Sequence, residues 1–231
     1  MNKLFLDIET IPAGEELTGP LKTLYQKRKA KHEERSEEEF VSFEKYFDAT
    51  ALDGSFGRIV CIGYTVNDGK VDALSGEEKN ILESFWEIAS NADMFIGHNI
   101  HDFDLAFILQ RSTVLGVKPT WQLFEEPGIP KYKVSKFLDF ARYKSAPIFD
   151  TMWEWTHWGD TRNKIGLEHV AIALGIPTPK EGIDGSKVNE FYKAGKVKEI
   201  VEYCKRDVET TRAVYKKMIF EGSKNLEVLP F

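Results

Sequence analysis

The first eleven residues, MNKLFLDIETI, hold the pattern that decides the fold, an apolar run that stops at an acidic pair. Lys3–Leu6 reads as a compact hydrophobic strand, and Asp7 follows it at once. Because side chains at i and i+2 of a strand point to the same face, Asp7 and Glu9 direct their carboxylates together. Paired carboxylates at the end of a core strand repel each other and are costly to desolvate. A bound hard cation such as Mg²⁺ or Mn²⁺ removes both costs, whereas an acidic strand end open to water is the alternative.

Apolar and alternating runs predict four further strands. The stretch RIVCIGYTV at 58–66 leads into Asp68-Gly69, a dipeptide suited to a type I′ hairpin turn. Residues 70–74 then return as the third strand. The runs ADMFIG at 92–97 and APIFDTM at 146–152 predict the fourth and fifth.

Helical periodicity fills the spaces between these strands. Ser75 and Glu78 have the spacing of a capping box in front of a helix that extends to Ala89. Asp184 or Ser186 would cap a short helix that ends at Gly195. Further helices are expected over residues 103–115, 164–174 and about 196–220. Strands alternating with helices predict an α/β fold.

Two stretches are interpreted as insertions in a single domain that covers residues 1–231. Residues 14–57 include the charge run KRKAKHEERSEEE, and their apolar residues recur at helical spacing, which predicts two helices with solvated outer faces. Residues 120–145 interleave Lys and Arg with Tyr and Phe, a composition typical of a groove for a single-stranded backbone. A surface excursion pinned by its aromatic residues is an equal alternative for the second stretch.

Composition limits the classes of function. The chain is 42% hydrophobic and 29% charged, as expected of a globular protein with a buried core. No stretch approaches the roughly 20 apolar residues that span a membrane, and no signal-peptide cleavage site follows the first strand. We therefore expect a cytoplasmic protein without a membrane partner. The net charge of −6 argues against binding nucleic acid by bulk electrostatics but allows local binding of a short end.

The two cysteines, Cys61 and Cys204, are far apart in the sequence. Their spacing matches no metal-binding or redox motif, so we expect free buried thiols in a reducing compartment.

Residues 97–111, GHNIHDFDLAFILQR, form a second motif at a junction of strand and helix. Asp104 falls in the first turn of the predicted helix, where free backbone amides and the helix dipole stabilise a carboxylate. Asp102 is a rival for this role, and either acid could be a plain N-cap. His98 and His101 would suit zinc, but no third nitrogen or sulfur ligand stands at a suitable spacing.

The third motif, YCKRD at residues 203–207, lies on the last predicted helix. Tyr203 and Asp207 are four residues apart and therefore neighbours on one helix face. They fall on the border of the apolar stripe, a position from which side chains reach a cleft while the helix stays anchored. A rim tyrosine beside an exposed aspartate is the plainer interpretation.

Asp-x-Glu-Thr after a first strand, Asn-x₃-Phe-Asp at a helix start and Tyr-x₃-Asp on a late helix appear here in that order. This order resembles the DEDD superfamily of 3′→5′ exonucleases, in its tyrosine branch. The DIET spelling, together with Asn99, Phe103 and Asp104, is most similar to the proofreading exonuclease domain of family-B DNA polymerases. The resemblance covers Lys3 to about Met218, apart from the two insertions.

The resemblance implies a ribonuclease-H-like fold, in which helices flank a mixed five-stranded sheet. It also implies two divalent cations, Mg²⁺ or Mn²⁺, that activate water and stabilise the phosphate and the leaving oxygen. The metal-binding acids would be Asp7, Glu9, Asp104 and Asp207, and Tyr203 would hydrogen-bond the attacking water. Contacts to the terminal nucleotide would come from Thr10, Ile11, Asn99 and Phe103. The implied reaction is hydrolysis of DNA, preferentially at single-stranded 3′ ends, to 5′-mononucleotides.

Several alternatives stay open at this point. An exoribonuclease of the same superfamily would differ in contacts to the 2′-position, which the sequence does not place. A non-catalytic nucleic-acid-binding scaffold is disfavoured because all four acids and Tyr203 are present. A phosphatase with an aspartyl nucleophile would need Asp at position 9, where this chain has Glu9. It would also need a second acid after Asp160, at the position that Asn163 occupies. With no polymerase in these residues, a separate polymerase or repair machine is a possible partner.

Overall fold

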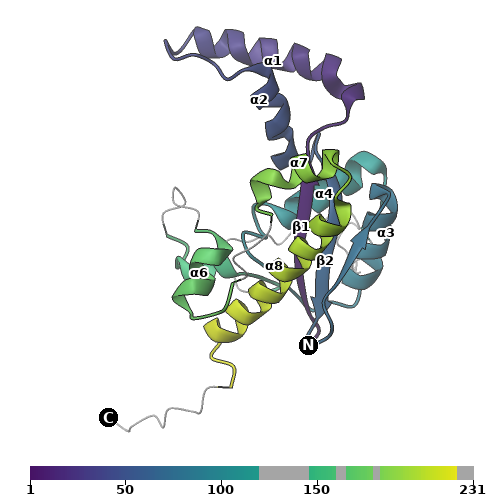
Figure 1. Ribbon diagram of the computed structural model, residues 1–231, viewed down its shortest axis with the longest axis vertical. Helices are drawn as coiled ribbons and strands as arrows, with labels where there is room; N and C mark the ends of the chain where they lie inside the picture. The colour runs from purple at the N-terminus through teal and green to yellow at the C-terminus, as the bar shows by residue number, and fades with distance from the viewer. Residues whose placement is uncertain (120–145, 160–164, 179–182, 223–231) are drawn as a thin grey trace, which may run out of the picture.

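The computed structural model describes residues 1–119, 146–159, 165–178 and 183–222 (Figure 1). Its centre is a five-stranded sheet in the order β3-β2-β1-β4-β5. β1 pairs antiparallel with β2 and β2 with β3, whereas β1, β4 and β5 run parallel. The strands are β1 (Lys3–Ile11), β2 (Arg58–Val66), β3 (Asp72–Ser75), β4 (Met94–Gly97) and β5 (Ile148–Asp150). The expected α/β, ribonuclease-H-like mixed sheet is confirmed.

The central strand, β1, is longer than the sequence predicts. The apolar run ends at Leu6, but pairing with β2 continues to Ile11, which lies opposite Arg58. The register shifts between Glu9 and Thr10, where the strand has an irregularity. The acidic pair therefore lies within a paired central strand, and the backbone ladder holds it in place.

Helices cover both faces of the sheet. Leu4 and Leu6 pack with α3 (Glu78–Ala89) and α4 (Asp104–Leu115) in one apolar cluster. The opposite face, which includes Phe5 and Ile11, lies under α7 (Val188–Lys193) and α8 (Val197–Met218). In Figure 1, α8 crosses in front of β1 and β2. Each large apolar side chain buried in these layers contributes roughly 1.5–3 kcal/mol to stability.

Two short helices pack against the C-terminal half of α8. These are α5 (Thr151–Trp155) and α6 (Leu167–Ala173), and residues of α6 share a buried cluster with Val214 of α8. The predicted fifth strand is shorter than expected because Asp150 ends it and caps α5.

Within the described ranges, no helix combines the length and apolar character needed to cross a membrane.

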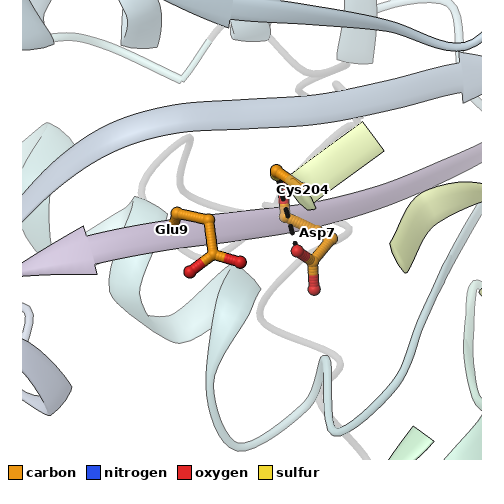
Figure 2. A group of neighbouring side chains, drawn as sticks. All are labelled: Asp7, Glu9 and Cys204. Atoms are coloured by element: carbon orange, nitrogen blue, oxygen red, sulfur yellow. Dashed lines mark hydrogen bonds between the residues drawn. The ribbon is translucent and has the colours of Figure 1, made fainter. Parts of the chain in front are cut away.

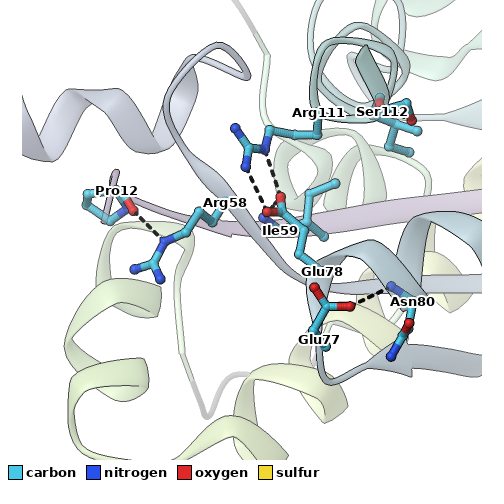
Figure 3. Close-up of polar contacts among 9 residues, drawn as sticks. Pro12, Arg58, Ile59, Glu77, Glu78, Asn80, Arg111 and Ser112 are labelled. Carbon is cyan, nitrogen blue, oxygen red and sulfur yellow. Dashed lines mark hydrogen bonds and ion pairs between the residues drawn. The ribbon is translucent and has the colours of Figure 1, made fainter. Parts of the chain in front are cut away.

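The predicted capping box in front of α3 is wrong (Figure 3). Glu77 is the N-cap, and its carboxylate accepts the Asn80 N–H. The Glu78 carboxylate instead accepts the Ile59 N–H at 2.8 Å and both the Nε and the Nη2 of Arg111 at 2.8 Å. This nearly buried, two-pronged ion pair joins α3 to α4 and to β2, and such pairing offsets the cost of burying both charges.

The hairpin between β2 and β3 also turns differently from the prediction. Asn67, with φ 52°, has the left-handed conformation that we expected at Asp68-Gly69. Asn67 and Lys3 exchange two hydrogen bonds, which fix this turn to the start of β1. As a result β3 begins at Asp72, two residues later than expected.

The segment between β1 and β2 forms an arm, defined here as residues 14–57. It holds α1 (Thr18–Glu33), α2 (Phe43–Asp48) and two 3₁₀ turns, η1 (Glu15–Leu17) and η2 (Ala49–Leu52). The two predicted helices are confirmed, and Figure 1 shows them standing beyond the end of the sheet at which β1 ends. The other proposed insertion, 120–145, lies outside the described residues.

Candidate active site

The acidic pair of β1 lies beneath α8. Asp7 and Glu9 lie on the same side of β1, as the shared strand face predicts, next to Cys204 of α8 (Figure 2). Three potential ligand atoms lie within 4.8 Å of one another: a carboxylate oxygen of Asp7, a carboxylate oxygen of Glu9 and the Sγ of Cys204. This tight group does not include Asp104 or Asp207, which approach it from α4 and α8. Glu9 is buried and Asp7 is partly exposed, so the group opens toward solvent at Asp7.

Asp104, the first residue of α4, is bound directly to β1. Its Oδ1 accepts the backbone N–H of Ile8 at 3.0 Å, between the two acids of the strand. β4 pairs with β1 only as far as Phe5, so beyond that residue no strand accepts the N–H groups on this edge of β1. The Asp104 carboxylate accepts one of them in place of a strand. Asp104 is buried, whereas its rival Asp102 is exposed. The structure therefore brings Asp104, and not Asp102, to the acidic pair.

The position of α8 depends on Gly63 of β2, the register partner of Asp7. A Cβ at this position would lie 2.9 Å from the Cys204 Sγ and 3.1 Å from the Cys204 carbonyl oxygen. The missing side chain lets the helix approach, and the Cys204 thiol lies between the two strands. The Gly63 N–H donates to Sγ at 3.2 Å, and the thiol donates to the Asp7 carbonyl at 3.3 Å.

Cys204 is therefore a residue of the site that the sequence analysis missed. Our search for cysteine spacings could not find it because its neighbours come from β1 and β2. Its position on the buried stripe of α8, between Tyr203 and Asp207, was the available signal.

The four acids act on one another electrostatically. Burial, then the charges of Asp104, Glu9 and Asp207, raise the pKa of Asp7 well above its usual value. Burial and the nearby Cys61, Asp207 and Asp104 likewise raise the pKa of Glu9. Burial raises the pKa of Asp104 to about 7 and that of Asp207 to about 6.

This convergence is the chemistry of a cation site. Without a counter-charge, such acids hold protons at pH values where exposed acids have lost them. The donor set of carboxylate oxygens fits a hard divalent ion, which would replace those protons. The carboxylates thus destabilise the folded protein by repelling one another when the site is empty, and they serve as ligands when a cation is bound.

Tyr203 stands beside Asp207 on α8, as predicted. Burial and the charges of Asp207 and Glu9 raise the pKa of its phenol far above the physiological range, so the hydroxyl keeps its proton. A hydrogen bond from Tyr203 lowers the pKa of Asp207, against the larger effect of burial. The phenol is therefore a hydrogen-bonding group and not a base.

The predicted nucleotide contacts fall into two groups. Thr10 and Ile11 are both buried: the Thr10 hydroxyl donates to the Ala51 carbonyl at 2.6 Å, and Ile11 packs under α8. Asn99 and Phe103 lie in the loop before α4, and both are partly exposed. The Asn99 Oδ1 is buried without a hydrogen-bond partner among the described residues, so it can accept a donor from a ligand.

Asp150 organises this loop, and the sequence analysis did not single it out. The side chain is fully buried. Its Oδ1 accepts the Asn99 N–H at 2.9 Å and the N–H groups of Met152 and Trp153, and its Oδ2 accepts the His101 N–H at 3.0 Å. Burial raises its pKa to about 6, although these four hydrogen bonds oppose the shift. Asn99 has φ 63°, and the Asp150 contact holds it in that conformation.

His98 has an ordinary polar role. His98 engages both ring nitrogens, with the Thr151 hydroxyl at 2.9 Å and the Ile165 carbonyl at 2.7 Å. Burial lowers its pKa, which favours the neutral ring. Within the described residues, the one group with clustered metal-ligand atoms is that of Asp7, Glu9 and Cys204. The phosphatase alternative rests on Asp160 and Asn163, which lie outside the described residues.

Comparison with known proteins adds three observations. Residues 54–227 match a family described as a predicted 3′-5′ exonuclease related to the exonuclease domain of PolB. An uncharacterized protein of Methanocaldococcus jannaschii is 25% identical over 181 residues, which are 74% of this chain and 92% of that protein.

Among solved structures, the family B DNA polymerase of Pyrobaculum calidifontis aligns with a TM-score of 0.57 and 16% identity. The alignment covers 95% of this chain but 24% of the polymerase, so the likeness concerns one part of that protein and is one of fold. The family match covers most of the chain and includes the Asn99–Asp104 and Tyr203–Asp207 motifs. The chain thus belongs to the family of predicted 3′-5′ exonucleases related to the exonuclease domain of PolB.

Proposed function

We propose that the chain is a metal-dependent 3′→5′ exonuclease that removes 5′-mononucleotides from DNA, preferentially from single-stranded 3′ ends. The observation that carries this proposal is the convergence of acids from three elements, β1, α4 and α8, beside a protonated tyrosine. Family membership supports the reaction class. The choice of DNA follows the resemblance to the polymerase-associated domain.

In this proposal Asp7, Glu9, Asp104 and Asp207 hold two divalent cations, Mg²⁺ or Mn²⁺. Bound cations would supply an activated water and charge stabilisation for the phosphate and the departing 3′-oxygen. Tyr203, whose phenol stays protonated, would hydrogen-bond the attacking water and orient it. Asn99 offers its free Oδ1 to the terminal nucleotide, and Asp150 keeps the loop in place.

The thiol of Cys204 has a positioning role in this scheme. It donates to the Asp7 carbonyl and lies 3.5 Å from the Asp7 Oδ2, so it constrains the backbone and the carboxylate of that acid. A thiolate would add negative charge to an acidic site, but burial raises the pKa of Cys204 and keeps the thiol neutral.

End-labelled oligonucleotides test the proposal directly. With Mn²⁺ or Mg²⁺, a 5′-labelled single strand of DNA should give a ladder that shortens stepwise from the 3′ end, and EDTA should stop it. Cleavage of closed circular single strands, or release of the 5′ label in the first product, would contradict the polarity. A matched RNA strand distinguishes the exoribonuclease alternative, because faster RNA cleavage would reverse the proposed sugar preference.

A second measurement does not depend on hydrolysis. Mn²⁺ should raise the thermal unfolding temperature of the wild type, since a ligand bound only by the folded state stabilises it. The shift should shrink in Asp7→Asn and stay unchanged in Asp102→Asn, whose side chain is exposed. A wild type that binds DNA but shows neither cleavage nor a metal-dependent shift would favour the scaffold alternative.

A further inference from the structure

Helix α1 concentrates positive charge in a chain whose net charge is −6. It carries five basic residues and, before its last residue Glu33, no acid. All five side chains are exposed, and they are Lys22, Lys27, Arg28, Lys29 and Lys31. Among ion pairs between described residues, Lys29 with Glu33 at 3.7 Å is the one that involves α1. The charge is therefore available to a ligand.

Contacts within the arm hold helix α1 in place. Leu21 is the one residue of α1 that is buried, so this helix contributes little to the hydrophobic core around the sheet. Tyr25 packs its ring against Phe40, Phe43 and Tyr46 at 5.4–5.6 Å and donates its hydroxyl to the Val41 carbonyl. This aromatic cluster holds α1 against α2 while leaving the lysines in solvent.

The arm is also fastened beside the acidic site. The Thr10 hydroxyl donates to the Ala51 carbonyl at 2.6 Å, and the Ala13 N–H donates to the Thr50 hydroxyl at 2.9 Å. Both contacts join η2, the base of the arm, to the chain that follows Glu9. Figure 1 shows α1 and α2 projecting from this end of β1.

Acids flank the basic helix on both sides in the sequence. Glu15 and Glu16 precede it in η1, and the acids of the tip follow it at Glu33, Glu34, Glu37, Glu38 and Glu39. The catalytic acids themselves repel phosphate, so attraction of a polyanion has to come from elsewhere on the molecule. The basic body of α1, between the site and the acidic tip, is suited to that role.

We propose that the exposed lysines of α1 bind the phosphate backbone of the nucleic-acid strand whose 3′ end occupies the site, an inference that rests on the proposed function. The family match begins at residue 54, near the end of the arm, and does not cover α1. The proposal makes the arm a determinant of substrate length: long strands reach it and dinucleotides do not.

The test compares two variants of equal charge change. The arm variant is Lys27→Gln, Lys29→Gln and Lys31→Gln, which leaves Lys22 and Arg28 over their aromatic rings and keeps good helix formers in α1. The control variant replaces three exposed lysines outside the arm, Lys79→Gln, Lys198→Gln and Lys217→Gln. Circular dichroism should show unchanged helix content in both.

Binding is measured in EDTA, so that no hydrolysis is needed, by anisotropy of a labelled DNA strand of about 20 nucleotides. The arm variant should bind at least about tenfold more weakly at low salt, and its salt slope should fall by about 2, as expected for three lost phosphate contacts. The control should stay close to the wild type. Equal losses in both variants, or no loss in the arm variant, would overturn the proposal.

Kinetics separate this proposal from the proposed function. With Mn²⁺, the arm variant should show a raised KM for the long strand and unchanged hydrolysis of a dinucleotide. If the wild type binds the strand through the arm but hydrolyses neither substrate, the proposed function fails and the arm proposal stands. If the arm variant instead loses only self-association, seen by light scattering, the basic helix contacts a second copy and the proposal is wrong.

Discussion

The carboxylate of Asp104 accepts the backbone N–H of Ile8 at 3.0 Å, so the first residue of α4 is joined to β1 between Asp7 and Glu9. One oxygen of this acid closes the open edge of the central strand. Asp104 consequently has a structural role in addition to its proposed role as a metal ligand, and different substitutions separate the two.

Asp104→Asn should abolish hydrolysis while preserving the fold, because the amide oxygen can still accept the Ile8 N–H and one buried negative charge is removed. Asp104→Ala leaves that N–H unsatisfied, at a cost of about 1–3 kcal/mol. Thermal unfolding in EDTA should therefore rank Asn at or above the wild type and Ala below Asn. Asp102→Asn is the matched control and should leave hydrolysis unchanged. A folded Asp104→Asn protein that cuts at the wild-type rate would exclude Asp104 from the site.

The metal-free protein should lose stability as pH rises from 5 to 8. The pKa of Asp104 is about 7 and that of Asp207 about 6 in the folded protein, both above the usual value of 3.8. The folded state therefore binds protons more tightly than the unfolded state, and this stabilisation is lost as pH rises through the folded pKa values. With Mn²⁺ present, stability should instead increase as pH rises, because protons compete with the metal for these carboxylates at low pH. Unfolding temperatures in EDTA that rise over this interval would contradict the assignment.

Tyr203 and Asp207 should respond differently to substitution. Tyr203→Phe loses one positioning hydrogen bond, so single-turnover cleavage should slow on the order of 10- to 10³-fold. Asp207→Asn removes a proposed metal ligand and should reduce cleavage to background. Titration with Mn²⁺, followed by thermal shift, should show nearly unchanged affinity in the tyrosine variant and weaker binding in the aspartate variant. A Tyr203→Phe rate equal to the wild type would make this tyrosine a structural rim residue.

Gly63→Ala should displace α8, because a Cβ there would lie 2.9 Å from the Cys204 Sγ and 3.0 Å from the Val208 Cγ2. We expect a loss of about 1–3 kcal/mol in unfolding free energy. Activity should fall on the order of 10-fold or more, since small misplacements of catalytic groups are costly. Gly185→Ala, at an exposed position where no atom beyond the chain neighbours lies near the added Cβ, is the control and should be close to neutral. Equal stability of the two variants would refute the role of Gly63 as a contact point for α8.

Asp150→Asn should loosen the loop before α4. The amide oxygen can keep the Oδ1 contacts, but the amide nitrogen would face the His101 N–H, donor against donor. We expect a loss of about 1–3 kcal/mol in stability and a raised KM, because the loop carries Asn99. Asp184→Asn, at an exposed turn, is the control and should change the stability and the KM little. A normal KM in the Asp150 variant would show that the loop keeps its conformation without this carboxylate.

Much of the fold could be predicted from the sequence because it depends on neighbours a few residues apart. The alternation of Asp7 and Glu9, the start of α4 near Asp104 and the apolar stripe of α8 are local patterns, and the structure contains all three. The capping box before α3 was a local pattern too, yet it was wrong. Glu78 is drawn into an ion pair with Arg111, a partner that periodicity cannot reveal.

By itself, then, the sequence determined the order of the elements, the face of β1 that carries the acids and the family of the chain. The tertiary structure alone decided that β1 continues to Ile11, that Asp150 holds the loop of Asn99, and that Cys204 reaches Asp7. The physical reason is distance along the chain. These features need a partner strand, a buried carboxylate or a missing side chain at Gly63, each supplied by a segment that becomes a neighbour only when the sheet and α8 are packed together.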